Sequence, residues 1–282
     1  MKKLNVLMFA VIVVLFSGIL TSCEKEITLQ NPVSSDDVKQ QSPADPISRA
    51  IFENHNDTYM FGECAGEGHI IIDEEETPDG GKIVYAFTMY GQYGFENGAF
   101  IKVSGSGKIP VRITFDKDGN VIEYKEPLDG GMWKESNEEI FPEKYHGRIF
   151  ADNGKEYDEL RLQEHAYAQA YLDKIGRVAR IGEYADIEHK IPEMHVEASN
   201  KLLEYFGEYP YWIGTLEKIE DGVRYVYEKK TEEKSGGDAR VTFLKYEYDS
   251  GKVVEETVIS VENGELVYLK GTPRFRSSKY GM

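Results

Sequence analysis

The sequence contains very little cysteine. Only Cys23 and Cys64 occur in 282 residues. If Cys23 is modified, as argued below, Cys64 has no partner within the chain, so we expect no internal disulfide. A domain of this size can instead be stabilised by an ordinary apolar core.

Motifs of common metalloenzymes and nucleotide-binding proteins are also missing. The chain has no His-Glu-x-x-His sequence, and its six histidines show no spacing typical of zinc ligands. The glycine-rich segment 104–108 differs from a phosphate-binding loop at the positions that define such a loop. We therefore expect no metal and no cofactor.

Positive charge is scarce. Lysine and arginine number 33 against 50 acidic residues, which gives a formal net charge of −17. An acidic surface repels phosphates, so nucleic acid and anionic lipid headgroups are not expected as direct partners. The composition instead fits solubility or a cationic ligand.

Long apolar runs are absent except at the start of the chain. Lys2 and Lys3 precede an apolar run from Val6 to Leu20, and the segment Leu20-Thr21-Ser22-Cys23 resembles the lipobox of bacterial lipoprotein signal peptides. It predicts a signal peptide at 1–22, cleavage before Cys23, and lipid attachment to Cys23. An uncleaved anchor helix is the alternative, but the run is shorter than the ~20 residues that span a bilayer.

Residues 23–45 are polar and have no apolar periodicity. Such a segment buries too little apolar surface to offset the entropy of ordering it. We expect a flexible tether here, with the folded part held at the extracytoplasmic face of the cell membrane by the lipid on Cys23.

The rest of the sequence predicts an α+β fold. Asn-Gly and Asp-Gly pairs predict hairpin turns at 97–98, 118–119, 221–222 and 263–264. Helical periodicity and turn residues predict helices at 46–55, 135–140, 157–175 and 192–206, and strands at 68–74, 82–90, 99–104, 110–116, 121–125, 211–218, 223–229, 240–248, 252–261 and 265–270. The order of helix and antiparallel meander occurs twice, which predicts units at 46–176 and 177–282. Each unit is expected to pack its helices on one face of a curved antiparallel sheet. Two domains and one continuous sheet both remain open.

Between about residues 47 and 248, several segments resemble the extracytoplasmic region attached to BlaR-like membrane metallopeptidases of clostridia and their relatives. The segments are 62–69 (Gly-Glu-Cys-Ala-Gly-Glu-Gly-His), 89–98 (Met-Tyr-Gly-Gln-Tyr-Gly-Phe-Glu-Asn-Gly), 102–107 (Lys-Val-Ser-Gly-Ser-Gly) and 209–214 (Tyr-Pro-Tyr-Trp-Ile-Gly). The resemblance implies an extracytoplasmic module from a signalling setting. It implies neither peptidase activity nor antibiotic acylation, since the peptidase motif and a Ser-x-x-Lys arrangement are missing.

Tyrosine is abundant, at 19 residues. Tyrosine and tryptophan join apolar area to a polar tip and are enriched at recognition surfaces. Aromatic residues close to turns are therefore candidate ligand-binding residues: Tyr90, Tyr93, Phe95, Tyr209, Tyr211 and Trp212. The alternative is that these rings fill a core between sheet and helix.

Two further groups of residues have chemical potential. Cys64 lies near His69 in sequence and could act as a nucleophile with a base, although such cysteines are usually inert. The acidic run 73–76, followed by Asp79, could bind a cation, although such runs usually form solvated loops.

The leading hypothesis is a lipid-anchored, non-enzymatic binding or sensory module whose partner is a cationic ligand or an envelope protein. One alternative is an envelope enzyme that uses Cys64 or clustered carboxylates. Another is a structural or inhibitory partner of an envelope protein.

Overall fold

The structure, a computed structural model, describes residues 45–272 and 274, except 61 and 152. Cys23 and the predicted signal peptide lie outside these residues. The α-helices of the described part are α1 (Pro46–His55), α2 (Trp133–Ile140), α3 (Glu143–Ile149), α4 (Gly154–Ile175) and α5 (Val196–Tyr205). The strands are β1 (Cys64–Glu76), β2 (Lys82–Glu96), β3 (Ala99–Gly105), β4 (Ile109–Phe115), β5 (Val121–Lys125), β6 (Ile181–Glu183), β7 (Gly214–Glu220), β8 (Val223–Glu233), β9 (Ala239–Glu247), β10 (Val253–Glu262) and β11 (Glu265–Lys270).

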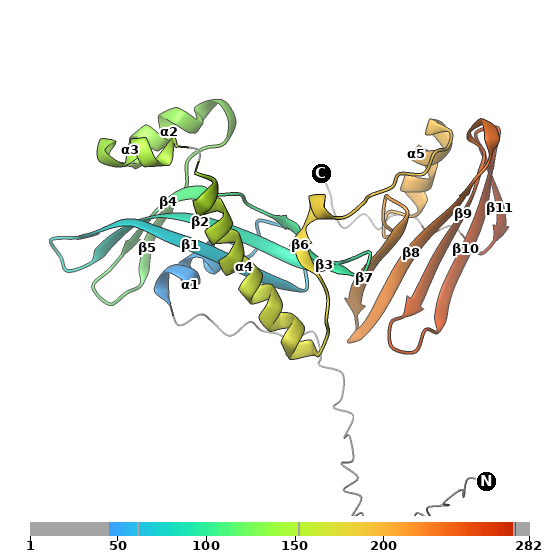
Figure 1. The fold of residues 1–282 in the computed structure, drawn as a ribbon, viewed down its shortest axis with the longest axis horizontal. Helices are drawn as coiled ribbons and strands as arrows, with labels where there is room; N and C mark the ends of the chain where they lie inside the picture. Colours follow the sequence, from blue (N-terminus) through green and yellow to red (C-terminus); the bar gives the residue numbers. More distant parts are fainter. Residues whose placement is uncertain (1–44, 61, 152, 273, 275–282) are drawn as a thin grey trace, which may run out of the picture. The chain divides into compact units, whose positions relative to one another are not determined.

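All of these strands belong to one open sheet, so the α+β class is confirmed. The order along its main path is β11-β10-β9-β8-β7-β2-β3-β6, while β1 and β4 also pair with β2, and β5 pairs with β4 (Figure 1). Every pairing is antiparallel except the short parallel one between β3 and β6. The two predicted meanders are joined by hydrogen bonding at one register position, Glu96 opposite Leu216.

The hairpin turns follow from local chemistry. Asn97, Asp221 and Asn263 each adopt a positive φ of about 50° and are each followed by a glycine with positive φ. Two consecutive residues with positive φ form the tight turn whose twist matches that of antiparallel strands, and Asn-Gly or Asp-Gly is its favoured sequence. These turns were predicted from the sequence, and the structure places hairpins at all three.

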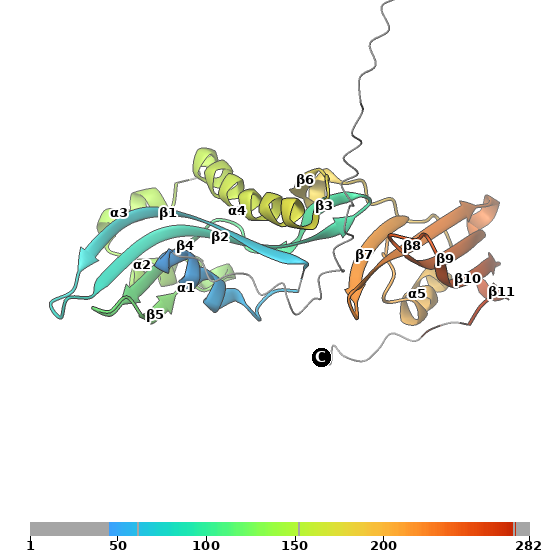
Figure 2. The same ribbon diagram turned by 90° about the horizontal axis from the view of Figure 1, so that it is seen from below.

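Strand β2 is covered on both faces, which differs from the predicted packing of helices on one face. Val84, Ala86 and Tyr90 pack against α1, whereas Phe87 and Met89 lie on the opposite face in a cluster with Leu160 of α4. Figure 2 shows α1 and α4 on opposite sides of β1 and β2. A strand buried on both faces loses the alternation of polar and apolar residues, and β2 is indeed buried at every position from Val84 to Glu96.

Helix α4 lies unusually close to β1. A Cβ atom at Gly66 would lie 2.6 Å from the backbone oxygen of Glu164, and one at Gly68 would lie 2.3 Å from that of Leu160. Glycine is required at both positions because any side chain would collide with the helix backbone. The sequence predicted a strand from residue 68, whereas β1 begins four residues earlier, at Cys64.

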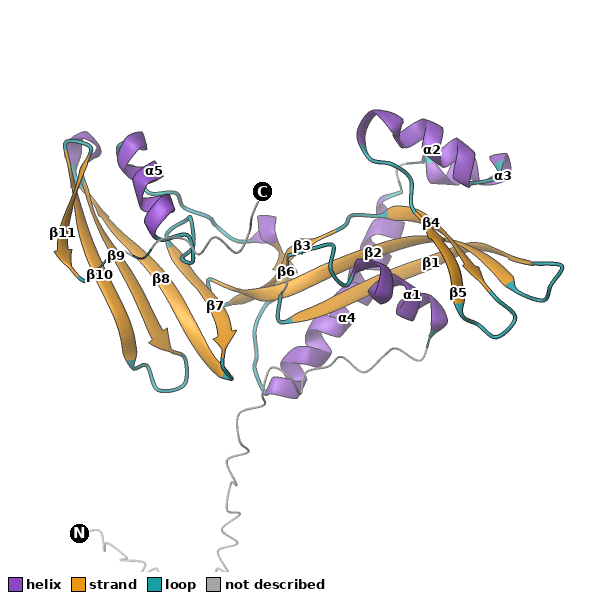
Figure 3. Ribbon diagram, turned by 180° about the vertical axis from the view of Figure 1, so that it is seen from behind, coloured by secondary structure: helices purple, strands orange, loops and turns teal. Residues whose placement is uncertain are grey.

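The last helix packs on the other part of the sheet. Ala198, Leu202 and Phe206 contact strand residues of β9 and β10, including Phe243 and Ile259 (Figure 3). Phe206 and Phe243 stack with ring centroids 3.8 Å apart. The predicted helix at 192–206 is shorter in the structure and begins at Val196, while the predicted helix at 157–175 begins three residues earlier, at Gly154.

A buried ionic network joins β7 and β8 to the segment before β1. Arg224 donates to both carboxylate oxygens of Glu63 and also to Glu217, which forms a second ion pair with Arg177. The Arg177 guanidinium lies 3.6 Å from the centroid of the Phe95 ring. These contacts add ionic and cation–π interactions where only one backbone register position connects β2 to β7.

No helix within the described part of the chain is long and apolar enough to cross a membrane.

Candidate functional site

A cavity of about 510 Å³ lies beside the first turn of α1. It is bordered by the ends of β1 and β2, by the turn that joins them and by the turn between β4 and β5. Its lining residues are Asp45, Pro46, Ile47, Ile71, Glu74, Glu76, Gly80, Gly81, Lys82, Val84, Phe115, Asp116, Lys117 and Gly119. A volume of this size lies within the ~300–1,000 Å³ range of small-molecule sites.

The apolar wall of the pocket is formed by residues at the edge of a hydrophobic core. Ile47, Val84 and Phe115 are nearly buried and pack together with other residues of α1, β2 and β4. Ile71 is 43 % exposed and lies on β1 just before a register shift between Ile71 and Asp73. The wall is preorganised, because rigid secondary-structure elements supply these apolar side chains.

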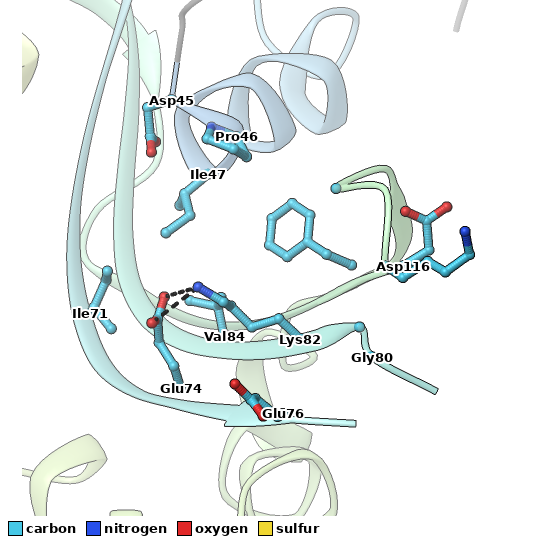
Figure 4. Close-up of a pocket in the computed structure, with 14 residues that line it drawn as sticks. Asp45, Pro46, Ile47, Ile71, Glu74, Glu76, Gly80, Lys82, Val84 and Asp116 are labelled. Atoms are coloured by element: carbon cyan, nitrogen blue, oxygen red, sulfur yellow. Dashed lines mark hydrogen bonds and ion pairs between the residues drawn. The ribbon is translucent and has the colours of Figure 1, made fainter. Parts of the chain in front are cut away.

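The rim of the pocket is mostly acidic. Lys82 Nζ lies 3.2 Å from both carboxylate oxygens of Glu74, and this pair is visible below Ile47 in Figure 4. Lys117 forms an ion pair with Asp118. Glu76 and Asp116 form no ion pair with any residue that the structure describes, which leaves two carboxylates for a ligand.

Asp116 keeps its charge through local hydrogen bonds. Its carboxylate accepts from the Asn120 side chain at 2.9 Å and from the backbone N–H groups of Asn120 and Asp118. These bonds, led by the Asn120 side chain, lower the pKa of Asp116. The carboxylate is therefore held ionised at the edge of the cavity.

Asp45 connects the rim to a buried polar cluster. Its carboxylate accepts from the Ser48 N–H at 2.7 Å as the N-cap of α1 and lies 3.8 Å from His69 Nε2. The other ring nitrogen of His69 lies 3.2 Å from Glu67, whose carboxylate also accepts from the hydroxyls of Ser48 and Tyr167. Burial alone would lower the pKa of His69, but Glu67 and Asp45 outweigh it and raise that pKa.

The acidic run 73–76 is part of β1 rather than a loop. Alternation along the strand separates its carboxylates: Glu74 and Glu76 line the pocket, whereas Asp73 and Glu75 bind Lys144 on the other side. The run therefore does not converge on one point, and no group of potential metal-binding side chains occurs among the residues described.

The structure divides the predicted aromatic residues into two sets. Tyr90, Tyr93 and Phe95 are at most 1 % exposed and belong to the cores on the two faces of β2. In this packing they offer no surface to a ligand, which agrees with the alternative that they fill the core.

Tyr209, Tyr211 and Trp212 instead lie on the loop between α5 and β7. Tyr211 is 42 % exposed, while Tyr209 packs edge-on against Tyr227 and Phe243. Trp212 packs edge-on against His189, whose ring forms a hydrogen-bonding contact with Glu96 at 3.1 Å. None of the six predicted aromatic residues lines the cavity.

Cys64 and His69 do not form a nucleophile–base pair in this structure. They are five residues apart on a regular part of β1, so their side chains point to opposite faces of the sheet. Burial, and secondarily the charge of Glu63, raises the pKa of the Cys64 thiol. A thiol that stays protonated is a poor nucleophile.

The pocket was only partly predictable from the sequence. The acidic run and the Asp-Gly turn at 118–119 were singled out, but as a separate cation site and as a hairpin turn. The apolar residues of the wall could not be distinguished from other core residues, because the cavity forms only where four chain segments meet.

No family model matches this chain, and comparison with curated proteins and with solved structures yields no significant match.

Proposed function

We propose that this protein is a lipid-anchored, extracytoplasmic binding module whose pocket takes a ligand with an apolar body and a cationic group. The single observation that carries the ligand class is the pocket beside α1, which combines an apolar wall with two carboxylates, Glu76 and Asp116, that have no cationic partner among the described residues. An apolar body would gain about 25 cal/mol for each Å² that it buries. The cationic group would pair with Glu76 and Asp116.

The location rests on the sequence. The lipobox-like segment ends at Cys23, which lies 22 residues before Asp45 at the rim of the pocket. Two acyl chains anchor a protein stably, whereas one binds only marginally. Cys23→Ala is expected to remove lipid labelling and release the protein from membranes; continued labelling and membrane fractionation of this variant would refute the anchor.

Binding can be tested with the mature, soluble chain and hexyltrimethylammonium, which carries both an apolar tail and a fixed positive charge. We expect concentration-dependent stabilisation against heat, because a ligand that binds only the folded state shifts unfolding by mass action. Hexanoate supplies the same tail with the opposite charge, and tetramethylammonium supplies the charge alone. Both are expected to bind much more weakly.

Substitutions test whether hexyltrimethylammonium binds in the pocket beside α1. Glu76→Gln removes an exposed carboxylate that makes no hydrogen bond or ion pair with the described residues, and should weaken hexyltrimethylammonium binding a few-fold. Ile71→Trp should fill the cavity and abolish binding. Glu204→Gln on α5 is the matched control and should bind as the unsubstituted protein does. Equal binding by the Glu76 and Glu204 variants, or equal binding of hexanoate, would exclude this pocket as a cation site.

A further inference from the structure

The α5 side of the C-terminal strands carries three lysines among aromatic rings. Lys218 Nζ and Lys245 Nζ lie 4.8 Å and 4.9 Å from the centroid of the Tyr227 ring. Lys245 forms an ion pair with Glu220, and Lys218 donates to the backbone oxygen of Glu208 at 3.1 Å. Lys218 and Lys245 therefore have identifiable partners in the structure.

Lys229 is different. Its side chain is only 5 % exposed, and its ammonium group makes one hydrogen bond, to the backbone oxygen of Tyr211 at 2.9 Å. No carboxylate among the described residues lies within ion-pair distance. An ammonium group has three N–H donors, so two donors of this buried cation have no acceptor among the described residues.

Two aromatic rings also lie near the Lys229 ammonium group. Its Nζ lies 5.8 Å from the Tyr211 ring centroid and 6.0 Å from that of Phe243, which is its register partner on β9. Burial is the cause that lowers the pKa of Lys229 to about 8. Cation–π contacts offset only part of the cost of removing an ammonium group from water.

A second donor without an acceptor lies two residues further along the same strand. The Thr231 hydroxyl is shielded from solvent and makes no hydrogen bond within the part of the chain that the structure describes. Because side chains alternate along a strand, Lys229 and Thr231 are on the same face of β8, with Cα atoms about 7 Å apart. The oxygens of a small anion can accept hydrogen bonds from both of these buried donors.

We propose that Lys229 and Thr231 form a second ligand site, which binds a small organic carboxylate beneath the exposed ring of Tyr211. One carboxylate oxygen accepts from the Lys229 ammonium and the other accepts from the Thr231 hydroxyl. Tyr211, which is 42 % exposed, contacts the apolar body of the ligand. This site is independent of the pocket beside α1 and has the opposite charge preference.

The probe is benzoate, with benzamide as an uncharged molecule of the same shape. We expect benzoate to shift the NMR resonances of the Lys229 side chain in a saturable way and to raise the pKa observed for that amine. Benzamide should do neither. Lys229→Met is expected to weaken benzoate binding at least tenfold, and Thr231→Val several-fold, since hydrogen bonds to charged groups are the stronger ones.

Lys230→Met is the matched control. Lys230 is the next residue on β8, points to the opposite face and pairs with Glu228 at 3.0 Å. This variant should bind benzoate normally. The proposal is overturned if benzoate leaves the Lys229 resonances unchanged, or if the Lys229 and Lys230 variants bind it equally. If Lys229→Met does not fold, Thr231→Val and the titration of Lys229 in the unsubstituted protein decide the question.

Discussion

Two lysines in different regions of the sheet are equally inaccessible but differ in their partners. Lys102 on β3 is 9 % exposed; its Nζ lies 2.9 Å from Glu164 Oε1 and donates to the backbone oxygen of Ser106. Lys229 on β8 is 5 % exposed and, within the described ranges, donates only to the backbone oxygen of Tyr211. The same residue type at similar burial is thus neutralised in one region and left unpaired in the other.

The helix that covers each region accounts for the difference. The buried residues of α4 include Glu156 and Glu164, and the Glu164 carboxylate accepts a hydrogen bond from Lys102. The buried residues of α5 are Ala198 and Leu202, so this helix brings no carboxylate to Lys229. A buried charge without a partner is costly, which makes Lys229 the position where a ligand would relieve the greatest electrostatic cost.

The largest effect is expected for Lys102→Met, which would leave the fully buried Glu164 without a cation. Removing one partner of a buried pair typically costs about 3–5 kcal/mol. Urea unfolding at neutral to alkaline pH should show a loss of this order. The double variant Lys102→Met/Glu164→Leu should recover most of it; if the double variant is as unstable as the single one, the pair is not the cause.

The loss should also depend on pH. Burial raises the pKa of Glu164 from 4.5 to about 7, against the opposing effect of Lys102. A raised pKa gives stability that is present below the unfolded value and is lost as pH rises through the folded value. Without Lys102 that pKa rises further, so the deficit of Lys102→Met should be small near pH 5 and grow above pH 7.

Gly91→Ala should have the next largest effect, because the Lys102–Glu164 pair occupies the space beside Gly91. A Cβ atom at Gly91 would lie 1.9 Å from Glu164 Oε1 and 2.9 Å from Lys102 Cε. Such overpacking typically costs about 1–3 kcal/mol. Gly94→Ala on the same strand is the control, since its Cβ would lie at an ordinary 3.5 Å from Val103. Comparable unfolding free energies for the two variants would contradict this explanation.

Much of the fold was predictable from local patterns. The bounds of α1, β5 and β11 agree with the prediction, and the Asn-Gly and Asp-Gly turns are where the sequence placed them. These features depend on interactions between residues close in sequence, such as a helix cap or a two-residue turn. Helix α3 was missed because it is short and contains Gly147, which lowers helix propensity.

The candidate sites were less predictable, because they depend on contacts between distant segments. Nothing near Lys102 in the sequence indicates Glu164, 62 residues later, as its partner. The predicted strand ended at residue 74, and acidic runs such as 73–76 usually form solvated loops, yet the whole run belongs to β1. Because side chains alternate along a strand, Glu74 and Glu76 face the pocket, whereas Asp73 and Glu75 face Lys144 of α3.

The smallest effect is expected for Lys229→Met, and its sign is opposite to that of Lys102→Met. The folded state holds the pKa of Lys229 near 8, below the ordinary value of 10.5. Between these values the unfolded chain binds more protons than the folded one, so this residue makes stability rise with pH by at most about 1.4 kcal/mol per unit. Methionine removes that dependence.

Lys229→Met should therefore be more stable than the unsubstituted protein at pH 7, by about 1 kcal/mol once the lost bond to Tyr211 is included. This advantage should shrink as pH rises through 8 and reverse before pH 10, because a slope of about 1.4 kcal/mol per unit accumulates to more than the advantage itself. Urea unfolding across this range measures it, with Lys230→Met as the control that shows no such trend. A Lys229→Met variant destabilised to the same extent at every pH would mean that Lys229, like Lys102, has an anionic partner in the folded state.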